Sequence, residues 1–379
     1  MIAPGLFGLI VGLSSLLLGS DEAEIVFAGD AMQHDSQLAA ARTKSGTYDY
    51  SACFRALKPY IASADYAVVN LETPLGGRNF TGYPMFCSPD AYAEALKKAG
   101  FDLALTANNH ILDRGDAGLR RTVVTLDSLK LTHIGTYRNS TERTERLPLV
   151  KDINGFAVGF LNYTYGTNGL TPGPVVKVDY IDTALIRRDI ETARRAGAEI
   201  ITVCLHWGVE YRLLPEPSQR RLADAIHRMG ADIVMGGHPH VIQPMELKKG
   251  DDGRNRLTVY SLGNFLSGMR TSDTRGGAMA SVKLKRDSLG RAYIDDASYR
   301  LVFTLTPLPG SGDNFRVIPA ELHAPDRLRE QQRAEFVRRA ENVFNQHNIG
   351  VSRDTIPVAE VARQRALARR HYLMSNDED

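Results

Sequence analysis

The sequence predicts a layered α/β domain, and three observations carry this prediction. Short apolar runs alternate with amphipathic stretches up to about residue 262, apolar and polar residues alternate after Gly277, and small polar clusters follow most of the early apolar runs. Strands that alternate with helices favour parallel sheets, whereas a period of two is typical of half-exposed antiparallel strands. We therefore expect a mostly parallel sheet structure that gains antiparallel strands late in the chain.

These patterns also place the individual elements. The expected strands are short and apolar and cover residues 24–28, 67–70, 102–106, 132–134, 157–161, 200–205, 233–235 and 258–262. The expected helices cover 91–99, 118–129, 180–195 and 218–228, and the expected antiparallel strands cover 279–285 and 299–305. Residues 307–312 predict a loop, 325–347 a helix with Phe336, Ala340, Val343 and Phe344 at helical spacing, and about 355–372 an Arg-rich helix.

The N-terminus predicts an export signal. Residues 2–20 carry no charge and are rich in leucine, and charge begins at Asp21. We expect residues 1–20 to be a signal peptide or an N-terminal membrane anchor, with a buried helix of the fold as the alternative. The main domain is then expected at 24–306, and a loop with C-terminal helices at 307–379. Export would place the protein in the cell envelope, in the periplasm or on the outer face of the cytoplasmic membrane, anchored or secreted.

Composition argues against a nucleic-acid partner. The 379 residues carry a formal net charge of +2, so there is neither a global basic field nor an acidic bias. The three cysteines, Cys53, Cys87 and Cys204, match no zinc or redox motif. Cys53 and Cys87 are expected either to pair in an oxidising compartment or, with Cys204, to be small buried hydrophobic residues.

Five of the expected strands are followed by residue types that bind metal ions. These residues are Asp30 and His34, then Asn70 and Glu72, Asn109 and His110 with Asp113, His206, and finally His238 and His240. Ligands bind at the carboxyl ends of parallel strands, so we expect these clusters to converge. Residues two apart on an extended loop face the same way, which allows both histidines of the last cluster to enter one cavity. The alternative is five unrelated surface turns.

The ligand types suit particular metals. Carboxylates, an amide and imidazoles without a thiolate favour Zn, Mn or Fe over Cu(I) or an iron–sulfur cluster. There are enough ligands for two divalent ions that share one carboxylate. Such a pair, roughly 3.5–4 Å apart, generates hydroxide and holds the attacking and leaving oxygens of a hydrolysis.

The motifs resemble those of the poly-γ-glutamate capsule-synthesis (CapA-type) family. Their order is also that of the calcineurin-like metallophosphoesterases. The CapA-type wording is carried by Gly29-Asp30-x-Met32, Asn70-Leu71-Glu72-Thr73-Pro74, Ala107-Asn108-Asn109-His110, His206-Trp207-Gly208-x-Glu210-Tyr211, His238-Pro239-His240-Val241 and Tyr260-Ser261-Leu262-Gly263-Asn264-Phe265. The resemblance covers about residues 24–270.

The resemblance implies a four-layer α/β/β/α sandwich of the metallo-dependent phosphatase type, with a C-terminal helical extension beyond the motifs. It implies that Asp30 and His240 hold one metal. Asn109, His206 and His238 would hold the other, and Glu72 would bridge the two. His110 takes the position of the proton donor to the leaving group, a role that suits a side chain with a pKa near neutrality.

Two further sets of residues are expected at the site. Met32 stands where the phosphoesterases carry a histidine, and His34, two residues on, is expected to serve in its place as a metal ligand. Residues that follow ligand positions are expected to line a substrate pocket, or else to make loop hydrogen bonds; they are Glu210, Tyr211, Gln243, Glu246 and Asn264.

The resemblance implies a metal-dependent hydrolase of capsule or envelope polymer metabolism. Its metal-bound hydroxide would attack a phosphoester or a γ-glutamyl amide, and its substrate would be an anionic envelope polymer or a phosphoester. The alternative is a non-catalytic subunit that binds the polymer or assembles with a membrane synthase or export complex. An intracellular phosphodiesterase would require residues 1–20 to belong to the fold.

Overall fold

A computed structural model describes residues 22–375, with the side chains of residues 368–375 excepted. The predicted signal peptide or anchor at 1–20 lies outside the described residues. Within residues 22–375 no helix combines the length and the apolarity that a membrane crossing requires.

Every strand and helix expected from the sequence patterns is present, and several short elements are added to them. The strands are β1 (Glu22–Ala31), β2 (Tyr66–Leu71), β3 (Leu103–Leu105), β4 (Thr132–Ile134), β5 (Thr136–Tyr137), β6 (Leu149–Ile153), β7 (Phe156–Thr164), β8 (Lys177–Val178), β9 (Ile200–His206), β10 (Ile233–Gly237), β11 (Ile242–Lys249), β12 (Asn255–Leu262), β13 (Asn264–Leu266), β14 (Gly276–Arg286), β15 (Ala292–Leu305), β16 (Arg316–Pro319) and β17 (Ser352–Arg353). The helices are α1 (Asp35–Ala41), α2 (Lys58–Ser63), α3 (Asp90–Ala99), α4 (Gly115–Ser128), α5 (Ser140–Arg146), α6 (Thr183–Arg195), α7 (Pro217–Arg228), α8 (Arg327–His347) and α9 (Val358–Ser375).

The strands form two large sheets. The first has the order β16-β15-β14-β1-β2-β3-β4, with β13 beside β1 and β17 beside β15. Its β1 to β4 run parallel, and β14, β15 and β16 are antiparallel additions. The second has the order β11-β12-β10-β9-β7-β6, with a parallel centre and antiparallel edges. The expectation of a parallel sheet structure with late antiparallel strands is confirmed.

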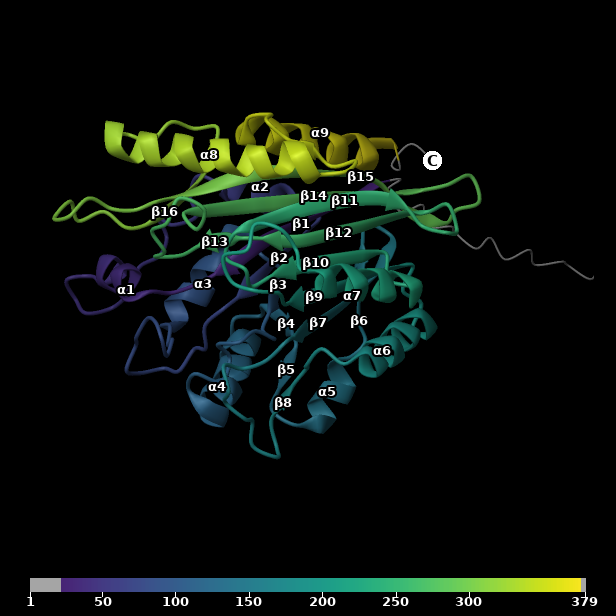
Figure 1. Cartoon of the computed structure of the whole chain (residues 1–379), viewed down its shortest axis with the longest axis horizontal. Helices are drawn as coiled ribbons and strands as arrows, with labels where there is room; N and C mark the ends of the chain where they lie inside the picture. The colour runs from purple at the N-terminus through teal and green to yellow at the C-terminus, as the bar shows by residue number, and fades with distance from the viewer. Residues whose placement is uncertain (1–21, 376–379) are drawn as a thin grey trace, which may run out of the picture.

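The two sheets pack face to face. One buried cluster joins Phe27 and Val68 of the first sheet to Phe160 and Ile233 of the second. On its other face the first sheet packs against α2 and α3, and the second packs against α6 and α7. The result is a four-layer α/β/β/α sandwich, as expected (Figure 1).

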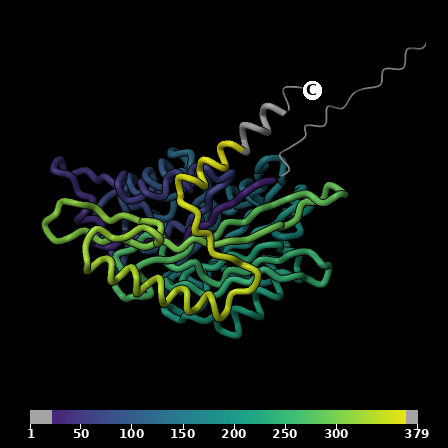
Figure 2. The backbone as a smooth tube through the Cα atoms, turned by 90° about the horizontal axis from the view of Figure 1, so that it is seen from above, coloured from purple at the N-terminus to yellow at the C-terminus, as the bar shows by residue number. Residues whose placement is uncertain are grey.

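The C-terminal helix α8 is part of the same core. Its Phe336, Ala340, Val343 and Phe344 are buried in the cluster between the sheets, as their spacing predicted. The helix contacts β11 of the second sheet and β15 of the first, so it covers one open side of the sandwich (Figure 1). Figure 2 shows α8 and α9 running one after the other across this side. The predicted boundary at residue 306 stays a prediction.

The cysteines are buried and unpaired. Cys53, Cys87 and Cys204 are all free thiols within the described part of the chain. Of the two expectations, the structure supports the one in which all three are small buried hydrophobic residues.

Candidate metal centre

The carboxyl ends of four parallel strands bring five of the predicted ligands together. Asp30 ends β1 and Glu72 follows β2 in the first sheet, whereas His206 ends β9 and His238 and His240 follow β10 in the second. All five side chains are buried. The centre therefore lies at the seam between the two sheets, at one end of the sandwich.

The ligand atoms form two overlapping groups. Glu72, His238 and His240 make one group, and Asp30, Glu72 and His206 make the other. Within each group one ligand atom per residue lies within 4.8 Å of the others. Glu72 belongs to both, which is the arrangement that a carboxylate bridging two ions requires. The pairings implied by the resemblance are also close, because His240 Nδ1 lies 3.3 Å from Asp30 Oδ2 and the His206 and His238 rings lie 4.8 Å apart.

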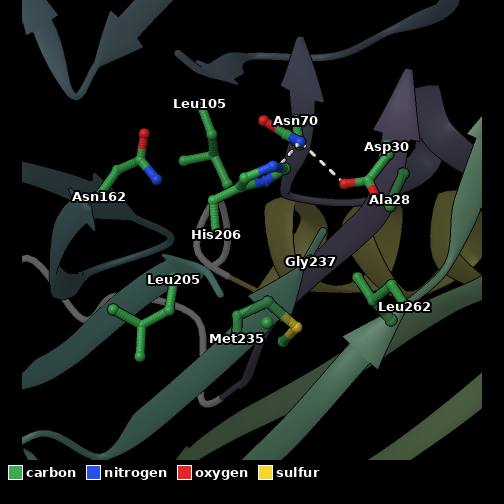
Figure 3. Close-up of a pocket in the computed structure, with 12 residues that line it drawn as sticks. Ala28, Asp30, Asn70, Leu105, Asn162, Leu205, His206, Met235, Gly237 and Leu262 are labelled. Carbon is green, nitrogen blue, oxygen red and sulfur yellow. Dashed lines mark hydrogen bonds between the residues drawn. The ribbon is translucent and has the colours of Figure 1, made fainter. Parts of the chain in front are cut away.

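Asn70 links the two sheets at the centre. Its Nδ2 donates to Asp30 Oδ1 at 2.8 Å and lies 3.4 Å from His206 Nδ1 (Figure 3). The same nitrogen lies 3.4 Å from Glu72 Oε2. One amide thus orients a ligand from each sheet and the shared carboxylate, as outer partners of metal ligands commonly do.

Local backbone chemistry explains why these sequences place the ligands. A Cβ at Gly29 would lie 2.0 Å from Gly263 O, so only glycine lets β1 approach the chain that leads into β13. At this close approach of the two backbones, Asp30 N donates a hydrogen bond to Gly263 O at 2.9 Å. His238 and His240 have φ values of 99° and 58°, which side chains rarely adopt. Strained backbone conformations of this kind persist only where the surrounding structure holds them in place, and they are concentrated at functional sites.

Electrostatics at the centre favour a bound cation. Burial, and then the neighbouring Asp30 carboxylate, raise the pKa of Glu72 well above its usual range. Burial also opposes ionisation of Asp30, but the hydrogen bond and the charge of His240 bring its pKa down to about 2. Burial disfavours the charged form of His240, but Glu72 and Asp30 raise its pKa to about 9. Asp30 and His240 therefore balance each other, and a cation is needed to compensate the buried charge if Glu72 is to ionise.

Two buried ligand atoms at the centre lack a hydrogen-bond partner among the described residues, and a small cavity lies next to the centre. Glu72 Oε1 and His238 Nδ1 make no hydrogen bond within residues 22–375, although both are buried. A cavity of about 20 Å³ borders Asp30, Asn70 and His206, but Glu72, His238 and His240 do not line it, and its other side chains are mostly apolar (Figure 3). That volume suffices for one water-sized guest. Unpartnered ligand atoms, a shared carboxylate and nitrogen–oxygen donors together fit a divalent ion.

His110 stands beside the centre with an acidic partner. Its Nδ1 lies 2.8 Å from Asp113 Oδ2, and that oxygen also accepts from Phe86 N at 2.7 Å. The Phe86 ring meets the imidazole edge-on at a centroid distance of 4.5 Å. Asp113 therefore fixes the ring orientation and leaves Nε2 as the nitrogen that can exchange a proton with a ligand.

The remaining predicted ligands divide into one at the centre and one near it. Asn109 Oδ1 lies 2.9 Å from His206 Nε2, so Asn109 is at the centre. His34 caps α1, and its Nδ1 accepts from Gly268 N at 3.0 Å. It belongs to neither group of ligand atoms found among the described residues. Burial lowers the pKa of His34 to about 4, and the charges of His240 and His110 act in the same direction, so His34 lies near the centre without joining either group. Its role as a metal ligand stays a prediction.

The expected substrate-pocket residues also separate. Tyr211 is 55% exposed, and its ring lies 6.3 Å from that of His240, while Asn264 Oδ1 lies 3.1 Å from His240 Nδ1. Glu210 contributes its charge to the environment of both His206 and His240. Gln243 is buried and bonded to Gln219 and Arg212 O. Glu246 lies on β11 and pairs with Arg220 of α7, away from the ligands.

Tyr165 is a site residue that the sequence did not reveal. It follows β7, and its ring lies 4.5 Å from that of His238 and stacks on His206 at 6.4 Å with an interplanar angle of 12°. Its backbone N donates to His206 O at 2.9 Å, and 47% of the side chain is exposed. The only signal for it was an aromatic residue at the carboxyl end of a parallel strand.

The chain is similar to known capsule proteins over about two thirds of its length. Residues 24–269 match the family described as bacterial capsule synthesis protein PGA_cap. The capsule biosynthesis protein CapA of Bacillus anthracis is 28% identical over 262 residues, which cover 65% of this chain and 61% of that protein. The PGA biosynthesis protein CapA of Bacillus subtilis (strain 168) is 28% identical over 273 residues, covering 69% of this chain and 68% of the relative. The match thus spans less than two thirds of the B. anthracis protein.

A solved structure overlaps more loosely. The calcineurin-like phosphoesterase YfkN from Bacillus subtilis superposes with a TM-score of 0.43 at 11% sequence identity, covering 85% of this chain and 97% of that one.

Proposed function

Because this chain belongs to the PGA_cap family of bacterial capsule synthesis proteins, we propose that it is an exported, metal-dependent hydrolase of an anionic envelope polymer of the poly-γ-glutamate type. One observation carries the proposal: Glu72 is shared by two groups of ligand atoms, so one buried carboxylate would serve two adjacent cations. Support for export comes from the uncharged segment at residues 2–20.

Five residues of this chain would hold the metal. Asp30, Glu72, His206, His238 and His240 supply the ligand atoms, and Asn70 orients three of them. A bound divalent pair supplies an activated water and neutralises negative charge on the group under attack. Zn, Mn and Fe are the ions that this donor set suits.

The chain's own residues provide the remaining chemistry. His110, held by Asp113, is placed to donate a proton to the leaving group. Tyr165 and Tyr211, both half exposed, stand next to the metal-ligand histidines and border the approach to the centre. An ester oxygen or an amide nitrogen is the atom that would take the proton, which corresponds to a phosphoester or a γ-glutamyl amide substrate.

A non-catalytic polymer-binding role is the second candidate. It is favoured by Met32, which replaces a histidine of the phosphoesterases, and by His34, whose Nδ1 is engaged by Gly268 N. In that case the same site would hold the polymer or dock on a membrane synthase or export partner.

Metal content of the full chain and of three variants tests the proposal. We expect wild type to take up to two equivalents of Zn, Mn or Fe by elemental mass spectrometry after reconstitution. His238→Ala should lose one equivalent, and Glu72→Gln should lose both because both groups share that carboxylate. His323→Ala is the matched control, since this exposed histidine only pairs with Glu330.

Hydrolysis then separates the two candidates. A metal-loaded wild type that cleaves bis-p-nitrophenyl phosphate or γ-glutamyl oligomers is an enzyme, and one that binds the oligomers without cleaving them is the polymer-binding protein. Full metal content in Glu72→Gln would refute the shared site on which the proposal rests.

A further inference from the structure

The loop between β13 and β14 is held by Asn264, which contacts the metal-ligand candidate His240, and by His34. Asn264, whose Oδ1 lies 3.1 Å from His240 Nδ1, donates through Nδ2 to Thr274 O at 2.9 Å. The same nitrogen lies 3.4 Å from Met269 Sδ. Gly268 N reaches His34 Nδ1 at 3.0 Å. The loop is therefore fixed along the rim of the centre.

Two arginines are carried on this loop next to those contacts. Arg270 follows Met269 and Arg275 follows Thr274, so each is adjacent to a residue that touches Asn264. Arg270 is exposed and Arg275 is partly buried. Burial, and then the neighbouring Arg270, lower the pKa of Arg275, so the two guanidinium groups lie close enough for their charges to interact.

No acidic side chain within residues 22–375 forms an ion pair with either arginine. The acid of their own loop, Asp273, is held instead by Arg339 of α8 through contacts of 2.6 and 2.5 Å. Two like charges held together on a fixed loop repel each other, and an anion between them relieves that repulsion. Guanidinium groups bind carboxylates and phosphates through paired hydrogen bonds.

We propose that Arg270 and Arg275 form an anion subsite beside the metal centre, which binds a carboxylate of the polymer chain next to the group held at the centre. The inference rests on the proposed function, because it identifies the substrate as a repeating anion. The centre engages one group of the polymer at a time, so a neighbouring carboxylate needs a separate cationic contact. Phosphate groups of a polymer offer similar chemistry, and the experiment distinguishes them.

The test compares binding of three probes to the metal-loaded full chain by isothermal titration calorimetry. The probes are a γ-glutamate decamer, a polyphosphate of similar charge, and orthophosphate. We expect R270Q/R275Q to weaken decamer binding about tenfold, in keeping with the loss of charge-assisted hydrogen bonds, while metal content and orthophosphate affinity stay within twofold. The control R187Q/R188Q removes the same charge from exposed arginines of α6 and should bind the decamer as wild type does.

A second variant keeps the test valid if the double variant misfolds. Arg270→Glu changes only an exposed side chain, and it should weaken decamer binding at least as strongly at low salt. Unchanged decamer affinity in both variants overturns the subsite, as does a wild type that binds orthophosphate but neither polymer. Loss of polyphosphate binding alone would assign the subsite to phosphate groups and overturn the carboxylate assignment. A wild type that takes up no metal would instead mark failure of the proposed function.

Discussion

Tyr165 illustrates how a residue without ligand atoms can shape the centre. Its ring packs against both His206 and His238, so it restricts the orientation of one ligand from each group. We predict that Tyr165→Leu weakens metal affinity about tenfold, the usual effect of losing an outer partner of a metal ligand. Tyr165→Phe keeps the ring and should keep the affinity. Competition with a chelator measures both, and equal affinities for Tyr165→Leu and wild type would show that the ring does not orient the ligands.

His110 should affect turnover and leave metal uptake intact. Its Nδ1 is bound by Asp113, and it belongs to neither group of ligand atoms. We predict that His110→Ala retains wild-type metal content and loses about 10²–10⁴-fold in kcat, the range for removal of a general acid. Asp113→Asn should cause a smaller loss. Steady-state kinetics on whichever ester or amide the wild type cleaves checks this, and undiminished hydrolysis by His110→Ala would remove it from the mechanism.

Sequence reasoning found the ligands because each follows a strand. Asp30, Glu72 and His206 lie at carboxyl ends of parallel strands, and a general rule of α/β sheets gathers such ends. Pairing of His206 with Asp30 depends on the distance between the sheets, which no local pattern records. Tyr165 was missed because an aromatic residue after a strand is ordinary in a core.

At the scale of elements, a buried ion pair ties α9 to β1. Arg365 reaches Glu24 through Nε and Nη2, each at 2.6 Å, and donates to Tyr60 O at 2.7 Å. Burial disfavours the charged form of Glu24, but the hydrogen bond and the charge of Arg365 outweigh it and lower its pKa. We predict that Arg365→Met lowers the free energy of unfolding at pH 7 by about 3 kcal/mol, because it leaves a buried carboxylate unpaired.

The pH dependence of that loss follows from the lowered pKa. Stabilisation by the pair is present above the ordinary pKa of Glu24, 4.5, and is lost as the pH falls through its lower folded value. The difference between wild type and Arg365→Met in urea unfolding should therefore shrink on acidification from pH 7. Arg363→Met, which removes an exposed arginine paired with Glu360, is the control. A difference in the free energy of unfolding that grows at low pH would contradict a stabilising Arg365–Glu24 pair.

The sequence patterns did not predict elements whose apolar residues lack a clear period. Residues Ile242–Lys249 form edge strand β11, although they carry a proline and several polar side chains and were read as pocket loop. Gln243 and Glu246 are expected to line a substrate pocket or to make hydrogen bonds, and as strand residues they make hydrogen bonds to α7. Edge strands tolerate proline and charge, which weakens the pattern that reveals central strands. The spacing of Phe336 and Phe344 was clear, and α8 was confirmed.

At the scale of the whole molecule, the metal centre and α8 both bridge the two sheets. Asp30 and Glu72 come from one sheet and the three histidines from the other, so binding one ion joins both sheets at that end. α8 joins them along the side through its contacts to β11 and β15. Residues after 306 therefore contribute to the same core that positions the ligands.

Truncation tests whether residues 24–306 fold alone. A chain ending at Thr306 loses β16, β17 and the α8 residues Phe336 and Phe344, each worth about 2 kcal/mol of burial. It also removes Asp354 and Glu321, the partners of the fully buried Arg300. We predict that this chain shows no cooperative thermal unfolding and aggregates through its uncovered sheet edges. A chain ending at Leu367 keeps these contacts and should unfold as the full chain does. Cooperative unfolding and full metal content in the shorter chain would instead establish 24–306 as an independent domain.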